Sequence, residues 1–149
     1  MREQGFCLHP LDFFYILFLV RIIFSKVKQM LIKDFGDCEE IIAGDKTILR
    51  EILHPDKAEV KIRYSLAHAL VLPGQTTRPH RLKTSEVYYI LDGQGIMYIN
   101  DEHAAVTAGQ TVYIPPGARQ NIKNSGTTDL KFLCIVDPAW RQEDEEVTG

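Results

Sequence analysis

Apolar and polar residues alternate with a period of two over much of the chain, a pattern that predicts strands rather than helices. Residues 60–64 alternate apolar with basic side chains, and an almost unbroken apolar run covers 66–72. Residues 46–53 could supply one more strand. Later runs, rich in β-branched and aromatic residues and bounded by Gly, Pro, Asn or Asp, cover 87–91, 96–99, 111–114 and 130–136. Short strands at intervals of roughly ten residues, with no helical segment between them, predict an all-β sandwich or barrel.

The length and apolar content fit one domain. The chain has 149 residues, of which 45% are hydrophobic, enough for a single core. We expect the barrel domain to cover residues 30–141 and an acidic flexible tail to cover 142–149, which contains Glu143-Asp144-Glu145-Glu146.

Residues 1–29 form a hydrophobic N-terminal extension. Its apolar stretch, residues 11–24, includes Asp12 and Arg21 and is shorter than the roughly 20 residues that span a bilayer. It also lacks the cleavage site of a secretory signal. Three interpretations stay open: a short membrane-associating helix, a helix docked on the core or a partner, or a translated upstream stretch with the functional start at Met30 instead of Met1.

Charge and cysteine content limit the kinds of partner and the location that we expect. The net charge is −3, and no Lys/Arg block or basic-aromatic alternation occurs, which argues against nucleic acid as a partner. The three cysteines form no C-x-x-C pair, so we expect no disulfide framework and a cytoplasmic location rather than a membrane one.

Two strings of residues carry the chemistry. From Gly74, five residues lead to His80, Leu82 follows two positions later, three residues then precede Glu86, and six more precede Gly93. The second string runs from Gly109 through five residues to Pro115, on to Gly117, across two residues to Gln120, and across three to Asn124.

In these spacings the chain resembles the cupin superfamily over about residues 60–137. The resemblance implies a jelly-roll barrel with a metal in its mouth, held by two histidines and a glutamate of the first motif and a histidine of the second. Here His80, Glu86 and Gln120 are the metal-ligand candidates, whereas Leu82 stands at an imidazole position and has no donor atom. Such a reduced set would bind Mn, Fe, Ni or Zn weakly.

Each candidate also has a plainer interpretation. His80 and Glu86 could form a structural ion pair or a metal-free acid/base couple, and Gln120 could simply hydrogen-bond a ligand. Because side chains alternate along a strand, Tyr88 and Ile90 should share the face of Glu86. Tyr88 is then a third catalytic candidate or an aromatic core residue.

The remaining pocket candidates are Leu82, Ile90 and His68. We expect His68 either to face the same cavity or to be covered by a dimer partner, because parity along its run is open to a β-bulge. Trp140 should close one end of the barrel or pack on a subunit.

Two classes of function follow. In the first, a single-domain cupin binds a small polar, sugar-like or keto-acid-like metabolite and acts as an isomerase or epimerase, with His80 and Glu86 as base and acid. A weakly bound divalent metal that polarises a carbonyl is an option within this class. A metal-dependent dioxygenase or decarboxylase is a variant of this class. In the second class the barrel binds or senses a small ligand without turnover. A homodimer is expected in both, because sheet edges and an apolar face need covering.

Overall fold

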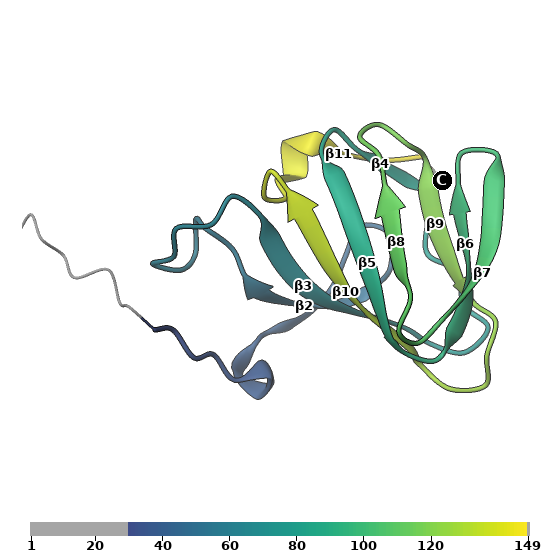
Figure 1. Ribbon diagram of the computed structural model, residues 1–149, viewed down its shortest axis with the longest axis horizontal. Helices are drawn as coiled ribbons and strands as arrows, with labels where there is room; N and C mark the ends of the chain where they lie inside the picture. Colours follow the sequence, from purple (N-terminus) through teal and green to yellow (C-terminus); the bar gives the residue numbers. More distant parts are fainter. Residues whose placement is uncertain (1–29, 149) are drawn as a thin grey trace, which may run out of the picture. The chain divides into compact units, whose positions relative to one another are not determined.

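The computed structural model describes residues 30–148, which form two antiparallel sheets (Figure 1). The first sheet contains, in order, β1 (Glu40–Ile42), β2 (Ile48–Leu53), β3 (Ser65–Val71), β10 (Leu130–Asp137), β5 (Ser85–Asp92) and β8 (Thr111–Ile114). The second contains β11 (Glu145–Val147), β4 (His80–Leu82), β9 (Gln120–Asn124), β6 (Gln94–Ile99) and β7 (Glu102–Thr107). Two 3-10 turns, η1 (Phe35–Asp37) and η2 (Gln142–Asp144), complete the elements. The predicted all-β jelly-roll architecture is confirmed.

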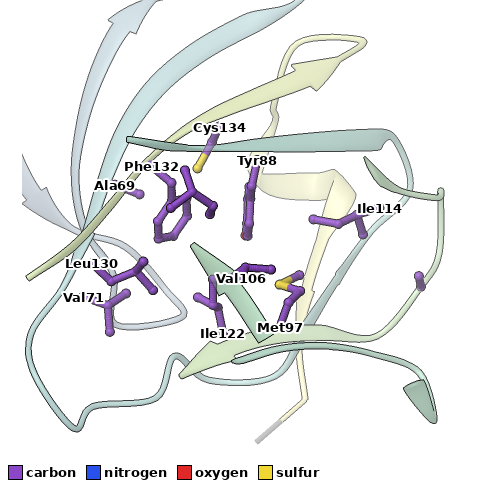
Figure 2. Packing of buried hydrophobic residues seen from close by; sticks show 12 residues of the cluster. Ala69, Val71, Tyr88, Met97, Val106, Ile114, Ile122, Leu130, Phe132 and Cys134 are labelled. Atoms are coloured by element: carbon purple, nitrogen blue, oxygen red, sulfur yellow. The ribbon is translucent and has the colours of Figure 1, made fainter. Parts of the chain in front are cut away.

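The core lies between the two sheets. Buried and half-buried residues alternate along the whole of β10, so every second side chain points inward. Figure 2 shows these side chains packed with residues of both sheets. The rings of Tyr88 and Phe132, on neighbouring strands, lie 4.5 Å apart between centroids. This packing holds β3, β5 and β10 rigidly side by side and fixes the inward direction of the polar residues on the same faces.

The β1–β2 connection is a tight hairpin turn. The Ala43 amide donates to the Thr47 carbonyl at 2.9 Å, and the Lys46 amide donates to the Ala43 carbonyl at 2.9 Å. Lys46 has a φ of 73°, the left-handed conformation that a three-residue hairpin loop requires. The turn buries Asp45, which is only 6% exposed, and directs it toward β4.

The acidic C-terminal segment is not the flexible tail that the sequence predicted. Residues 142–144 form η2, and β11 pairs with β4, placing Glu145 opposite Leu82 and Val147 opposite His80. Its neighbours add further backbone bonds, since the Lys83 amide donates to the Asp144 carbonyl at 2.9 Å. The acidic side chains do not prevent this pairing because a backbone ladder leaves every second side chain free to face solvent.

One predicted strand is wrong, and several short strands were not predicted. Residues 60–64 alternate in polarity but belong to the connection between β2 and β3, where no neighbouring strand pairs with them. The short strands β1, β4, β7 and β9 were not predicted, because runs of three to six residues with mixed polarity carry little periodic signal.

The motif glycine Gly93 sets backbone geometry. Gly93 has a φ of +83°, and a Cβ at this position would lie 2.6 Å from the Asp129 carbonyl oxygen. No side chain fits there, so glycine is required at the turn between β5 and β6.

The predicted hydrophobic extension, residues 1–29, lies outside the described residues. In residues 30–148 no helix is long and apolar enough to cross a membrane.

Candidate functional site

A cavity of about 140 Å³ lies inside the barrel, bounded by strands β1 to β5 and β10, the β1–β2 turn and the C-terminal segment. Most of its wall is apolar or aromatic. Its polar side chains gather from separate parts of the chain, and they include Asp45, Thr47, Ser65, His80, Glu86 and Glu145. Bringing together groups so distant in sequence is a consequence of the two-sheet topology.

His80 stands at the start of β4 and is 5% exposed. Its Nδ1 lies 3.2 Å from the Arg78 carbonyl oxygen and 3.9 Å from Oδ2 of Asp45. Asp45 is held in turn by Thr47, whose amide donates to Oδ1 at 3.0 Å and whose hydroxyl donates to Oδ2 at 2.6 Å. The carboxylate is therefore fixed beside the imidazole, an arrangement that orients the ring and favours a proton on Nδ1.

Glu86 projects inward from β5 and is paired with Gln120 of β9. The Gln120 amide nitrogen donates to Oε2 of Glu86 at 2.6 Å, and both side chains are buried. The Gln120 carbonyl oxygen is also buried and has no hydrogen-bond partner among the described residues. Rotating this amide by half a turn would let a protonated Glu86 donate to that oxygen, so Gln120 can accompany either protonation state of the carboxyl group.

Burial favours the protonated forms of three side chains: Glu86, Tyr88 and Cys134. Burial raises the pKa of Glu86 to about 7, while the Gln120 hydrogen bond and His80 oppose this rise. Burial, followed by the nearby Glu86 charge, raises the pKa of the Tyr88 phenol well above its ordinary value. Burial has the same effect on the pKa of the Cys134 thiol. At neutral pH, Tyr88 is therefore a hydrogen-bond donor, and Glu86 is available as either acid or base.

The C-terminal segment supplies the remaining wall. The Trp140 indole nitrogen donates to Oε2 of Glu145 at 3.1 Å, and the Trp140 amide donates to the Ser65 hydroxyl at 3.0 Å. His54 holds the same residue from outside, with its Nε2 2.9 Å from the Trp140 carbonyl oxygen. Trp140 and Glu145 thus form a hydrogen-bonded pair on the cavity wall.

The predicted site residues separate into two groups. His80, Leu82, Glu86 and Tyr88 line the cavity together, with Gln120 bonded to Glu86. Ile90 shares the inward face of Glu86 and Tyr88, but it is fully buried in the apolar core and does not line the cavity.

The assignment of His68 to the pocket is wrong. On β3 the residues lining the cavity are Ser65, Ala67 and Ala69, so His68 points to the opposite face. There its ring lies 4.8 Å from that of Phe35, in an edge-on arrangement. Burial, with the nearby Lys131 and Arg50 charges, lowers the pKa of His68.

Asp45, Thr47 and Glu145 were not predicted as site residues. A local signal did exist for the first two: Gly44-Asp45-Lys46-Thr47 is turn chemistry between two apolar runs, with an Asp placed to accept from the amide two residues on. Its contact with His80 depends on how the hairpin is set against β4, which no local pattern reports. Glu145 lies within the acidic run of the C-terminal segment, which the sequence predicted to be a flexible tail.

The described residues do not fit the metal site that the resemblance implies. Leu82 occupies one imidazole position with a hydrocarbon side chain, and Gln120 offers only a neutral amide oxygen, a weak ligand, where the family motif has the other imidazole. Residues 30–148 contain no group of three or more His, Cys, Asp or Glu side chains placed to hold a metal ion. His80 and Glu86 alone offer too few strong ligands for a transition metal.

Comparison with known proteins places the fold in a family. A Cupin domain model matches residues 67–136. The chain is 39% identical over 115 residues to the uncharacterized protein MJ1618 of Methanocaldococcus jannaschii, covering 76% of this chain and 91% of that protein. It is 32% identical over 88 residues to the oxalate-binding protein of Thermotoga maritima, covering 58% and 68%. In structure it resembles a Cupin 2 conserved barrel domain protein from Salinispora arenicola, with a TM-score of 0.64 at 16% identity, over 78% of this chain and 92% of that chain.

Proposed function

The chain belongs to the cupin superfamily, and from the chemistry of its own cavity we propose that it binds a small polar metabolite there and moves a proton on it, as an isomerase or epimerase does. The family alone does not select a reaction, because function resides in the site rather than in the fold. The observation that carries the proposal is the convergence of His80, with Asp45 behind it, and Glu86 on one cavity whose other walls are largely apolar.

Two proton-transfer groups on one ligand are what an isomerisation needs. In an epimerisation, one group removes a proton from a carbon next to a carbonyl and the other returns a proton to the opposite face of the same carbon. In an isomerisation, the proton is delivered instead to the former carbonyl carbon, while the hydroxyl proton of the first carbon passes to the carbonyl oxygen. His80 and Glu86 suit these roles because both side chains line the cavity and both carry an acid-base group, the pKa of Glu86 being raised to about 7. Tyr88 can donate a hydrogen bond to the carbonyl oxygen. The reaction conserves all atoms and electrons, so it requires no redox partner.

This proposal uses no metal. A dioxygenase or decarboxylase of this family would need a redox-active metal on a ligand set that residues 30–148 do not provide, so we derive no such step. Asp45 acts as a positioning residue for His80, since its Oδ2 lies 3.9 Å from Nδ1 of that imidazole.

Deuterium incorporation tests the proposal. The full chain would be incubated in D₂O with dihydroxyacetone, D-fructose, pyruvate and 2-hydroxyacetophenone in turn, and deuterium at the carbon next to the carbonyl would be followed by NMR. We expect incorporation into at least one probe, with the rate reduced at least 100-fold by His80→Gln and by Glu86→Gln. The matched controls are His103→Gln and Glu102→Gln, both exposed on β7, which should leave the rate unchanged.

The alternative is a non-catalytic ligand-binding or sensor cupin. Two observations support it: the Gln120 amide donates a hydrogen bond to Glu86, and the apolar Leu82 lines the cavity. A probe that raises the melting temperature of the wild type, yet gains no deuterium, would favour this alternative. Equal incorporation by wild type and both site variants would overturn the catalytic proposal.

A further inference from the structure

We infer that the cavity takes a compound built on a single ring, with hydroxyl or amino donors at one end, and that it discriminates against carboxylates. This inference rests on the proposed function, because it names the ligand class of the same cavity. It depends on three features of the cavity: the charge of its wall, the hydrogen-bonding groups on that wall, and its volume.

Acidic side chains dominate the charge of the cavity wall. Asp45, Glu86 and Glu145 line it together with a fourth acid, Glu51, whose charge is already matched by Lys57 at 2.8 Å. Among the lining residues this leaves His80 as the one basic group not engaged with Glu51, and it faces Asp45 at 3.9 Å. An anionic ligand would therefore enter a space where negative side chains outnumber positive ones, which raises its free energy of binding.

The hydrogen-bonding groups point the same way. Carboxylate oxygens accept but cannot donate when ionised, and each has lone pairs beyond those used in the structure. Thr47 uses its hydroxyl hydrogen on Asp45, and the Trp140 indole uses its hydrogen on Glu145, so two donors of the wall are already engaged. A ligand with hydroxyl or amino hydrogens complements the acceptors that remain, whereas a carboxylate would set acceptor against acceptor.

The size and the apolar walls select the body of the ligand. The cavity measures about 140 Å³, and an apolar cavity of ~150 Å³ is known to bind benzene. Leu82, Tyr88, Phe132 and Trp140 provide apolar or aromatic surface around it. One six-membered ring therefore fits, with its donors directed at the acidic groups, and we expect a fused two-ring compound to fit less well.

A series of related aromatic compounds tests the effects of charge and size separately. Benzyl alcohol, benzylamine and benzoate share one ring and differ in charge, and 2-naphthalenemethanol adds a second ring. We expect calorimetric titration of the full chain to give benzyl alcohol and benzylamine dissociation constants at least tenfold lower than that of benzoate. Binding of 2-naphthalenemethanol should be at least tenfold weaker than that of benzyl alcohol.

Two glutamate-to-glutamine variants test whether the acidic wall causes the preference against carboxylates. Glu145→Gln keeps an oxygen for the Trp140 indole but removes one negative charge from the wall, so the preference for benzyl alcohol over benzoate should shrink at least threefold. Glu146→Gln removes the same charge from the next residue of β11, which is exposed and does not line the cavity, and it should leave the preference unchanged.

The outcomes distinguish this inference from the proposed function. Benzoate binding as tightly as benzyl alcohol, or equal effects of the Glu145 and Glu146 variants, would overturn the ligand class while leaving small-molecule binding intact. Tight binding of the two-ring probe would overturn the size argument. Failure of all four probes, with a response to the acyclic dihydroxyacetone in the deuterium experiment, would overturn the ring assignment alone, whereas failure in both experiments would overturn the two proposals together.

Discussion

At the scale of single residues, Glu86 makes folding depend on pH. Its pKa is raised from 4.5 to about 7 in the folded protein, so between these values the folded state holds a proton that the unfolded state has released. This contribution to stability is complete below pH 4.5 and is lost as the pH rises through 7, amounting to on the order of 3 kcal/mol. We expect Glu86→Gln, which cannot ionise, to lack this loss.

Urea unfolding at pH 5 and pH 8 measures the effect. The stability gained by Glu86→Gln relative to wild type should be larger at pH 8 than at pH 5. Glu102→Gln, exposed on β7, serves as the control and should follow the wild-type profile. An unchanged difference between wild type and Glu86→Gln across this range would show that the carboxyl group titrates at its ordinary pKa.

Leu82 is the second residue whose identity decides the chemistry. It is 5% exposed on the cavity wall, at the position where the family motif has an imidazole. We expect Leu82→His to lower the dissociation constant for Mn²⁺ or Zn²⁺ at least tenfold, because a second imidazole joins His80 and Glu86. Leu91→His, on the exposed end of β5, introduces the same group away from the cavity and should not have this effect. Calorimetric titration reports both, and tight metal binding by the wild type itself would contradict our interpretation of the donor set.

At the scale of elements, the β1–β2 hairpin turn positions Asp45. Its carboxylate accepts two hydrogen bonds from the buried Thr47. Asp45→Ala leaves both donors without this partner and should lower the free energy of unfolding by about 1–3 kcal/mol. Asp45→Asn retains an oxygen acceptor and should lose less. Urea unfolding of the two variants at one pH distinguishes the contribution of the hydrogen bonds from that of the charge. Equal decreases in the free energy of unfolding would mean that the negative charge, rather than the acceptor, stabilises the turn.

The elements also show what the sequence could and could not predict. Strands β3, β5, β6, β8 and β10 were predicted because their periodicity and bounding turns are local. The pairing of β11 with β4 was not, since a short acidic segment becomes a strand only when an edge is available to it. The same distinction separates His80 and Glu86, which fixed spacings identify, from Asp45, which reaches His80 only after the sheets have formed.

At the scale of the whole molecule, the outer face of the six-stranded sheet exposes large apolar side chains. Tyr89 and Leu91 on β5 are 41% and 42% exposed, and Tyr113 on the edge strand β8 is 61% exposed. They share a face because residues facing inward, such as Tyr88 and Ile90, alternate with them. A contiguous apolar surface of this kind is typical of an interface, and twofold symmetry would let the same patch cover itself.

The homodimer predicted from the sequence can therefore be tested at this face. We expect sedimentation equilibrium to give a dimer for the wild type, and Tyr113→Glu to raise the dimer dissociation constant at least tenfold, because it would bury a charge in an apolar contact. Tyr113 is mostly exposed in the single chain, so this change should hardly alter the free energy of unfolding. His103→Glu, exposed on β7 of the other sheet, adds the same acidic side chain elsewhere and should leave the dimer intact. A wild type that sediments as a monomer, or a dimer insensitive to Tyr113→Glu, would show that the apolar face of this sheet does not join two chains.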